Sequence, residues 1–561
     1  MAKIFRAIVK NLFFAGWRVL FQHKEPEALI KDDISKAGSS KTLEDIYKEK
    51  KYAPPAIEEK AAKPLKVLLI NSNRFKQPWP VMPHGLLCVA AACDKAGHKA
   101  EFLDLCFSKD ANADISSAIS GFKPDVIGIS IRNIDNGVGY NTFFLLDEVK
   151  KEIIDPVKNI FKGPVVIGGP SVGISGREML DYFDLEYAVK GDGEACFTEF
   201  LSRISKNVSL AGLGGLVIRS RDGNIIQDPE PYRVTNLDTL AYPDPKKYLN
   251  LKLYRKFDSP LQIQSKRGCA LKCAYCTYNR IEGAICRLRD PKKIADEVER
   301  LVKDTGINHI EFTDSVFNIP LSHTKEVLKE IIKKNINGLR LRTLGLNPGA
   351  IDEELVDLMK RSGMNDVDLG IESACDVTLK SLKKNYTKED IIRSGKLLRD
   401  KGIAINWFLL VGAPQESEKT LEETIATVAS IADKWDLINF GIGIRAYNGA
   451  PITEDLRKKS PGISNNNFLY PVKYEPKDIS LEMIKKAVKL ASFKYPNIFM
   501  YDEDETTPLF LQKLGSLILK LFAPKEPIWK LFILNRKIEH ALGIRQIKRR
   551  IYMLHTPKIK I

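Results

Sequence analysis

Short, almost continuous apolar runs alternate with longer amphipathic segments along the first half of the chain. Runs of this kind predict buried strands, and apolar residues at helical spacing predict helices. Helical segments such as 85–96 and 141–152 separate the runs. The predicted strands are 67–70, 100–103, 126–130, 165–170 and 187–189. This order predicts a doubly wound, flavodoxin-like parallel sheet, whose ligand crevice lies beyond the carboxyl ends of the strands.

The same alternation continues in the second half of the chain. The predicted strands there are 261–264, 307–312, 339–344, 366–371, 403–411 and 437–444. Asp290 and Pro291 predict the start of the first helix, because aspartate caps helices and proline suits the first helical position. Strands and helices that alternate in this way predict a partial (β/α)6 barrel. Catalytic residues of such sheets lie at the carboxyl ends of the strands.

Three closely spaced cysteines follow the first of these strands. Cys269, Cys273 and Cys276 form the spacing C-x3-C-x2-C, and thiolates are soft ligands for iron-sulfur clusters or zinc. A 4Fe-4S cluster needs four ligands, so three protein thiolates leave one iron open for a small molecule. Zinc knuckles and ferredoxin loops use similar spacings, and Cys286 could close the site as a fourth ligand. The place of the motif at the carboxyl end of a strand favours the open cluster.

With this setting, the cysteine motif resembles that of the radical S-adenosylmethionine (SAM) superfamily, whose open iron binds SAM. The resemblance implies cluster ligation by the three cysteines, and it extends to the aromatic residue before the third one. It also implies SAM contacts at the ends of the fourth and fifth strands. The SAM-contacting residues implied in this way are Tyr275, Glu372, Ser373, Leu410 and Gly412. Asp314 is a weaker candidate, and Cys286 and Cys375 fit small buried hydrophobic residues better than ligands.

The strand ends of the first sheet carry glycines and polar residues, which any flavodoxin-like sheet would also show. Their order before a radical SAM core resembles the cobalamin-binding domain of cobalamin-dependent radical SAM enzymes, and the resemblance covers about residues 65 to 450. The implied cobalamin contacts are Ser130, Arg132, Asn133, Gly168, Gly169, Pro170, Gly191, Gly193 and Glu194. The loop 71–80 lacks the Asp-x-His-x-x-Gly motif that supplies a histidine to cobalt. We therefore expect no axial histidine, and we expect turn or capping roles for His84 and His98.

The length of 561 residues is too great for one hydrophobic core. We expect a basic amphipathic extension over 1–64, a cobalamin-binding domain over 65–210, a hairpin and linker over 211–255, a radical SAM core over 256–450, and a helical C-terminal region over 451–561. The nine cysteines are an odd number, and no signal peptide is evident. A reducing cytoplasm is therefore the expected compartment.

The net charge of +16 is concentrated near the two ends of the chain. Residues 1–24 and 509–561 mix basic residues with large apolar ones, and neither stretch holds an uninterrupted apolar span long enough to cross a bilayer. Such helices either lie on a membrane surface or pack on the protein or a partner, and both alternatives stay open. Nucleic acid is not expected, since the basic residues alternate with aliphatic ones and no RNA-binding module is recognisable.

The resemblance implies an enzyme that uses a 4Fe-4S cluster, SAM and cobalamin to methylate an unactivated carbon. A cobalamin-dependent cyclase, oxidase or rearrangement enzyme is the first alternative, and a non-catalytic iron-sulfur electron carrier is the second. The expected partners are a small-molecule or lipid substrate and a reductant such as flavodoxin or ferredoxin. A lipid becomes the better substrate hypothesis if the chain ends contact the inner face of the membrane.

Overall fold

The computed structural model describes residues 63–76, 79–137, 139–459, 468–501, 527 and 529–555. The basic N-terminal segment 1–24 lies outside the described residues, as does 509–526 of the basic C-terminal stretch.

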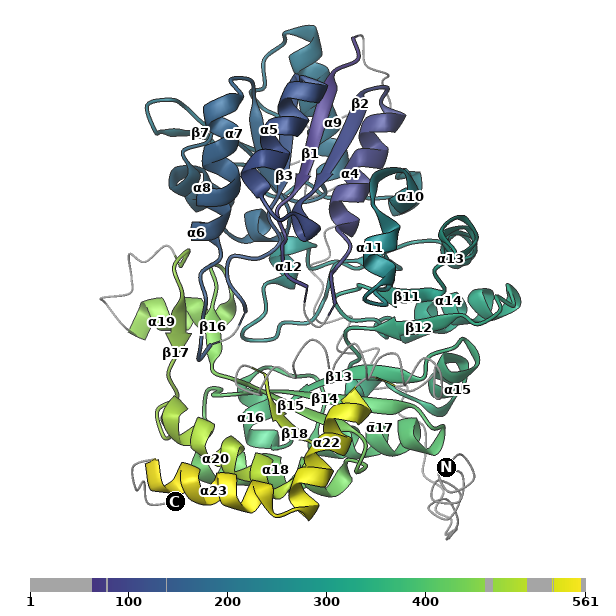
Figure 1. Cartoon of the computed structure of the whole chain (residues 1–561), viewed down its shortest axis with the longest axis vertical. Coiled ribbons are helices and arrows are strands. Elements are labelled where there is room, and N and C mark those ends of the chain that lie inside the picture. The colour runs from purple at the N-terminus through teal and green to yellow at the C-terminus, as the bar shows by residue number, and fades with distance from the viewer. Residues whose placement is uncertain are drawn as a thin grey trace. The chain divides into compact units, whose positions relative to one another are not determined.

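The first part of the described chain is a seven-stranded sheet with the order β2-β1-β3-β4-β5-β6-β7. Figure 1 shows β2, β1 and β3 of this sheet in the purple and blue part of the chain. Its strands are β1 (Lys66–Asn71), β2 (Lys99–Asp104), β3 (Val126–Ser130), β4 (Val165–Gly168), β5 (Tyr187–Val189), β6 (Leu216–Arg219) and β7 (Ile225–Gln227). The first five are parallel, as predicted, and their order 2-1-3-4-5 is that of flavodoxin-like sheets. The predicted hairpin, β6–β7, adds two antiparallel strands to this sheet.

Helices cover both faces of this sheet, because the central strands β1, β3 and β4 are apolar on both sides and must be covered on both. They are α4 (His84–Lys95), α5 (Ala111–Phe122), α6 (Leu146–Val149), the π-helical turn η2 (Lys150–Ile154), α7 (Asp155–Ile160), α8 (Pro170–Phe183) and α9 (Gly193–Lys206), with a 3-10 turn η1 (Leu105–Phe107) after β2. The predicted helix 141–152 begins only at Leu146. The preceding residues form a turn in which Asn136 donates to the carbonyl of Asn141 at 2.8 Å and accepts from the amide of Phe143 at 3.0 Å.

The second part of the described chain is an open barrel of parallel strands. These are β8 (Leu261–Ile263), β11 (His309–Phe312), β12 (Arg340–Thr343), β13 (Asp366–Glu372), β14 (Ala404–Val411), β15 (Leu437–Ile442) and β18 (Ile498–Met500). They pair as β12-β11-β8 and β13-β14-β15-β18, and a bridge between Leu346 and Leu369 joins the two groups. The six predicted strands are thus confirmed. The seventh, β18, lies in the C-terminal region expected to be helical.

Helices on the outside of the barrel bury the apolar side of each strand in one core. They are α13 (Pro291–Thr305), α14 (Leu321–Lys333), α15 (Glu353–Arg361), α16 (Asp376–Ser381), α17 (Lys388–Asp400), α18 (Glu418–Ile431) and α20 (Leu481–Lys494). The predicted start of α13 is confirmed, since the Asp290 side chain accepts a hydrogen bond from the amide of Lys293 at 2.9 Å.

Smaller elements connect and extend the two parts. They are η3 (Leu237–Thr239), α10 (Pro245–Tyr248), α11 (Leu251–Arg255), β9 (Lys266–Arg267), α12 (Tyr278–Ile281), β10 (Arg287–Leu288), η4 (Pro348–Ala350), β16 (Ile444–Ala446), α19 (Pro451–Lys459), β17 (Val472–Tyr474), α22 (Trp529–Ala541) and α23 (Ile544–His555). The last two helices lie within the region 451–561 that was predicted to be helical, whose described part also holds strands β17 and β18. No helix in the described ranges has both the length and the apolar character needed to span a membrane.

Candidate functional site

The three motif cysteines lie on one loop at the carboxyl end of the first barrel strand. The short strands β9 and β10 pair antiparallel on either side of the loop and of α12. The amide of Cys269 donates to Gly283 at 2.9 Å, and that of Ala274 donates to Leu382 at 2.9 Å. Gly268 has a φ of +98°, and an added Cβ would lie 2.1 Å from the carbonyl of Ile285. The loop is therefore held tightly on both sides, in a backbone conformation that only glycine adopts easily.

The environment of the three thiols suits iron-sulfur ligation. Burial raises the pKa of Cys269 to about 11 and that of Cys276 to about 12, and it also raises that of Cys273. Thiols in such surroundings ionise when they bind a metal, and nearby N–H groups stabilise the sulfur charge. The Lys384 ammonium lies 3.7 Å from the Cys273 sulfur, and the Tyr278 amide nitrogen lies 3.5 Å from the Cys276 sulfur. Among the described residues, no three His, Cys, Asp or Glu side chains converge on a single metal ion.

Beside the cysteine loop, the Glu372 carboxylate has three hydrogen-bond or ion-pair partners. It accepts hydrogen bonds from the hydroxyls of Tyr275 and Tyr386, at 2.5 Å and 2.7 Å, and it pairs with Lys384 at 2.9 Å. Glu372 ends β13 at a bulge and has a φ of +51°, a strained conformation that is often found at functional sites. Lys384 also contacts Tyr275 at 3.2 Å, so this group connects the cysteine loop to the end of β13.

Sequence reasoning missed Lys384 and Tyr386. Both lie between α16 and α17, in the segment that follows β13. Charged and aromatic residues in loops at the carboxyl face of a barrel are a usual signal of function. That rule would have pointed to this segment, although not to these two residues.

The other predicted SAM contacts are placed differently. Ser373 is fully buried, and its hydroxyl lies 2.8 Å from that of Thr424, so its predicted contact rests on the resemblance alone. Leu410 packs with Tyr275 against one small apolar cluster and therefore lies near the cysteine loop. The amide of Gly412 donates to the buried Glu416 carboxylate at 2.9 Å. Asp314 accepts from Ser265 at 2.6 Å and supports the strand before the loop.

A cavity of about 310 Å³ lies between the carboxyl ends of the first sheet and the mouth of the barrel. All the predicted cobalamin contacts except Asn133 line it: Ser130, Arg132, Gly168, Gly169, Pro170, Gly191, Gly193 and Glu194. From the barrel side it is lined by Gln262, Gln264, Arg267, Tyr278, Ile281, Glu282, Thr313 and Leu344. None of these barrel residues was predicted as a cobalamin contact, because this second wall comes from the packing of the two parts.

The glycines along the cavity have two different roles. Gly169 has a φ of +103°, and an added Cβ would lie 2.7 Å from the carbonyl of Ile131. A Cβ on Gly168 would meet only the carbonyl of Val189, at 4.0 Å, and would otherwise extend into open space. Gly169 thus serves the fold, whereas Gly168 leaves room along the cavity wall.

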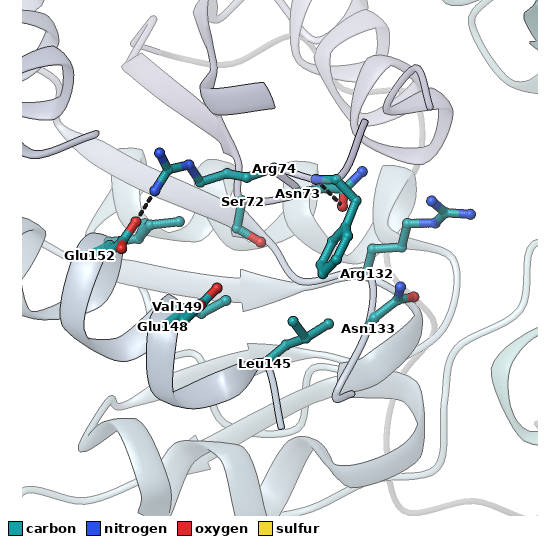
Figure 2. A pocket seen from close by; sticks show the side chains of 11 residues that line it. Ser72, Asn73, Arg74, Arg132, Asn133, Leu145, Glu148, Val149 and Glu152 are labelled. Atoms are coloured by element: carbon teal, nitrogen blue, oxygen red, sulfur yellow. Dashed lines mark hydrogen bonds and ion pairs between the residues drawn. The ribbon is translucent and has the colours of Figure 1, made fainter. Parts of the chain in front are cut away.

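Asn133 lies in a smaller pocket of about 40 Å³ next to the cavity (Figure 2). Arg132 lines both spaces, and in Figure 2 its guanidinium points away from the ion pair of Arg74 and Glu152. No hydrogen bond or ion pair joins the Arg132 side chain to another described residue. Its charge therefore stays available to a ligand in the cavity.

The segment 191–194, Gly-Asp-Gly-Glu, carries two carboxylates that pair with arginines of β9 and β10, the two strands beside the cysteine loop. Glu194 pairs with Arg267 at 2.6 Å, and Asp192 pairs with both Arg267 and Arg287. Burial alone would raise the pKa of Asp192, but the two guanidinium groups outweigh it and hold that pKa below its usual value. These ion pairs thus connect the first sheet to the strands beside the cysteine loop.

Of the two histidines near helix ends, His98 has the expected turn role, since its amide donates to the carbonyl of Cys93 at 3.0 Å after α4, whereas α4 has no side-chain cap at its start, next to His84. His84 is the first residue of α4 and lines the cavity, and its Nε2 lies 3.6 Å from the Cys88 sulfur. Burial, followed by the charges of Arg267 and Arg289, lowers the pKa of His84 to about 3. His98 is buried, and its Nδ1 accepts from the amide of Leu65 at 3.2 Å.

A row of polar side chains crosses the concave face of the barrel below the cavity. The strand register aligns Gln262, Glu311 and Arg342, and it aligns Asp368 with Asn406. Arg342 joins the two groups, through Glu311 at 3.0 Å and Asp368 at 2.8 Å. The ring of Trp79, from the loop after β1, lies under its guanidinium at 4.5 Å. The interior of the barrel is thus charged at this level.

Comparison with known proteins finds a family model for each of the two parts of the chain that line the cavity. Residues 263–428 match the family model of the radical SAM superfamily, and residues 78–201 match that of the B12 binding domain. The tryptophan 2-C-methyltransferase of Streptomyces laurentii is 24% identical over 503 residues, which span 78% of this chain and 81% of that protein. The anaerobic magnesium-protoporphyrin IX monomethyl ester cyclase of Rubrivivax gelatinosus is 25% identical over 335 residues, 58% of this chain and 57% of that protein.

A solved structure is similar over most of the chain. It is that of the radical S-adenosylmethionine methyltransferase TsrM from Kitasatospora setae, with cobalamin and a 4Fe-4S cluster bound. It aligns with a TM-score of 0.66 and 27% identity over 72% of this chain and 79% of its own.

Proposed function

We propose that this chain, which belongs to the cobalamin-dependent radical SAM methyltransferase-like enzymes, methylates an unactivated carbon of a small-molecule substrate. Its cofactors are a 4Fe-4S cluster, SAM and cobalamin. When bound, the cluster and SAM supply the means to remove a hydrogen atom from carbon, and cobalamin supplies the methyl group. The strongest support is the cavity that the glycine-lined sheet ends share with the barrel mouth, beside the three cysteines.

In this proposal the three motif cysteines hold the cluster, and the residues around Glu372 hold SAM. The amino acid part of SAM carries an ammonium and a carboxylate. Glu372 and Lys384 lie together beside the cysteine loop and offer the two complementary charges. The hydroxyls of Tyr275 and Tyr386 hold the Glu372 carboxylate in place. Leu410 and Gly412 are the proposed contacts on the adenine side of SAM, and Ser373 is a further proposed polar contact.

The first sheet would hold cobalamin mainly with backbone. Gly168, Gly193 and the helix start at Pro170 approach the cavity without bulky side chains, and Arg132 offers a charge at its edge. Ser130, Gly169, Gly191 and Glu194 complete the proposed wall, and Asn133 is a more distant contact in the adjoining pocket.

The polar row favours a small hydrophilic substrate over a lipid. A substrate that enters the barrel mouth meets Gln262, the member of the row that lines the cavity, and burying a hydrocarbon chain against its amide would leave that group poorly solvated. Tryptophan, the substrate named for one relative, is a small polar molecule of this kind. A lipid remains the alternative substrate class.

We also infer a reducing compartment and a flavodoxin or ferredoxin as electron donor. All nine cysteines are free in the structure, which suits a reducing cytoplasm. Since the matched domains are those of enzymes, a non-catalytic electron carrier is not favoured. Cyclisation stays a second candidate, because one relative is named as a cyclase.

The test is anaerobic incubation of the reconstituted enzyme with SAM, a reductant and separate lipid and aqueous cell extracts. The proposal expects 5'-deoxyadenosine, S-adenosylhomocysteine and a compound in the aqueous extract that gains one methylene unit. 5'-Deoxyadenosine without S-adenosylhomocysteine favours the cyclase alternative, and a methylated product only in the lipid extract overturns the hydrophilic substrate. If reconstituted protein loses all cobalamin on desalting, the assignment of the first sheet is wrong.

A further inference from the structure

The two C-terminal helices expose their apolar sides to solvent. On α22 these residues are Leu534, Ile538 and Leu542, which follows the helix, and on α23 they are Ile544, Ile547, Ile551, Met553 and Leu554. The exposed fractions include 68% for Leu542 and 82% for Leu554. Spacings of three and four residues put most of them on one face of each helix. We call this set the outer face of α22–α23.

This orientation is the reverse of that in an ordinary surface helix, where the apolar face packs on the core. The inner side of α23 carries Arg545, which is 5% exposed and donates to the carbonyl of Ser492 in α20. On the same side, the rings of Tyr552 and Phe493 lie 5.9 Å apart. These contacts fix the rotation of α23 and keep its isoleucines outward.

The inner side of α22 is fixed in a similar way. Ile533 is fully buried, and Trp529 donates to the carbonyl of Trp435 at 3.3 Å. The Lys537 ammonium lies 3.6 Å from the centre of the Trp435 ring. Both helices are therefore held against the barrel by their aromatic and basic residues, and the outer face cannot turn inward without breaking these contacts.

The charge around the outer face indicates what covers it. Residues 529–555 hold seven basic side chains, Lys530, Arg536, Lys537, Arg545, Lys548, Arg549 and Arg550, against the single acidic Glu539. Three of them, Arg536, Lys537 and Arg545, make the inner-side contacts with the barrel. Arg549 and Arg550 are exposed next to the isoleucines of α23. A second copy of this chain would bring an equally basic surface and be repelled. An anionic lipid surface offers both an apolar layer and negative headgroups.

We propose that the outer face of α22–α23 docks on an anionic lipid bilayer. Its leucines and isoleucines enter the boundary between headgroups and acyl chains, and Arg549 and Arg550 contact phosphates. The surface lies at the amino ends of the barrel strands, since Arg536 in α22 donates to Ile498 at the start of β18. The cavity lies at the opposite, carboxyl ends. The surface is thus an anchor rather than an entrance, and it fits a hydrophilic substrate as well as a lipid.

The test is co-sedimentation of the full-length protein with vesicles of phosphatidylcholine mixed with phosphatidylglycerol. The proposal expects binding at low salt, weaker binding at high salt and little binding to phosphatidylcholine alone. I547N/I551N should weaken binding by about tenfold or more, because it removes inserted apolar area. The matched control is Ile226→Asn, which changes an isoleucine that is 65% exposed on β7. Circular dichroism and cobalamin retention verify that each variant folds.

A second pair of variants isolates the charge. R549Q/R550Q should weaken binding and reduce its dependence on salt, whereas the control K458Q/K459Q on α19 should change neither. Absence of binding by the wild type at low salt overturns the proposal, as does unchanged binding by I547N/I551N. Light scattering tests the alternative that a second copy of this chain covers the outer face. If the wild type is a dimer and I547N/I551N is a monomer, the outer face is a contact between copies and the membrane proposal is wrong.

Discussion

The two walls of the central cavity are built in different ways. On the first sheet, backbone dominates, with Gly168 and Gly193 at the ends of strands or the start of a helix. On the barrel, polar side chains such as Gln262, Gln264 and Glu282 line the cavity. Glu372 and Lys384 form a connected group beside the cysteine loop, next to this lining rather than in it. One wall leaves space for a large ligand, whereas the other arranges charge.

The difference reflects what each wall has to do. A large preformed cofactor needs a cradle of the right shape, and backbone amides and small residues provide one at low conformational cost. A reacting centre needs charges in fixed places, and these require side chains held by partners. Removing side chains should therefore damage the barrel wall most, and adding volume should damage the sheet wall most.

The largest expected effect is the loss of a cluster cysteine. Cys269→Ala, Cys273→Ala or Cys276→Ala should each abolish SAM cleavage, because two thiolates cannot hold the cluster with one iron open. Production of 5'-deoxyadenosine and electron paramagnetic resonance of the reduced protein, with and without SAM, measure this. The matched control is Cys286→Ala, a neighbouring thiol that donates to the carbonyl of Gly268 at 3.5 Å. If Cys286→Ala loses the SAM-dependent spectrum as well, the three-cysteine assignment fails.

The next largest effect concerns the charge beside the cluster. Lys384→Met leaves the Glu372 carboxylate buried without its counter-charge, and breaking a buried pair costs about 3–5 kcal/mol of stability. We also expect SAM cleavage to fall by about tenfold or more, since one tenth of the rate corresponds to about 1.4 kcal/mol. Thermal unfolding and 5'-deoxyadenosine yield separate the two losses.

The adjacent lysine provides a control for this variant. Lys383 is exposed, and Lys383→Met removes the same charge one residue away. It should leave both stability and turnover close to the wild type. Equal losses in the two variants would show that general charge, and not the position of Lys384, matters here.

The sequence predicted the residues of local motifs, but not the contacts between distant parts of the chain. The glycines of the first sheet and the cysteines of the loop carry short, local patterns, so their places at strand ends could be predicted from spacing. The contact of Lys384 with Glu372 depends on the path of the chain through α16, and that of Arg267 with Glu194 depends on the packing of the two parts. Such contacts join residues that no local pattern connects. The strand β18 was missed for a similar reason, because its three residues gain their place only by pairing with β15.

The sheet wall can be tested by adding volume. Gly168→Leu should lower cobalamin retention severalfold or more while the fold persists, because a side chain there extends into the cavity. Gly169→Ala should instead lower the melting temperature, since its φ of +103° and the carbonyl of Ile131 leave no room for a Cβ. Absorbance of bound hydroxocobalamin after desalting and thermal unfolding measure the two effects. Full cobalamin retention in Gly168→Leu would falsify the proposed contact.

The smallest expected effect concerns His84, a titratable side chain on the sheet wall. Its pKa is lowered to about 3 by burial and by Arg267 and Arg289. Between its ordinary value of 6.5 and about 3, the unfolded chain therefore binds a proton that the native protein does not. The free energy of unfolding must then fall as the pH falls through this window, by at most about 1.4 kcal/mol per pH unit from this group.

His84→Asn should remove that contribution and flatten the pH dependence of urea unfolding below pH 6.5, whereas His540→Asn on the exposed side of α22 should leave it unchanged. Because we expect no axial histidine, the absorbance spectrum of bound cobalamin should be that of a base-off form in both the wild type and His84→Asn. A spectral change in His84→Asn alone would mean that a side chain, and not only backbone, ligates the cofactor from the sheet wall. The contrast between the two walls would then be smaller than their glycines and charges suggest.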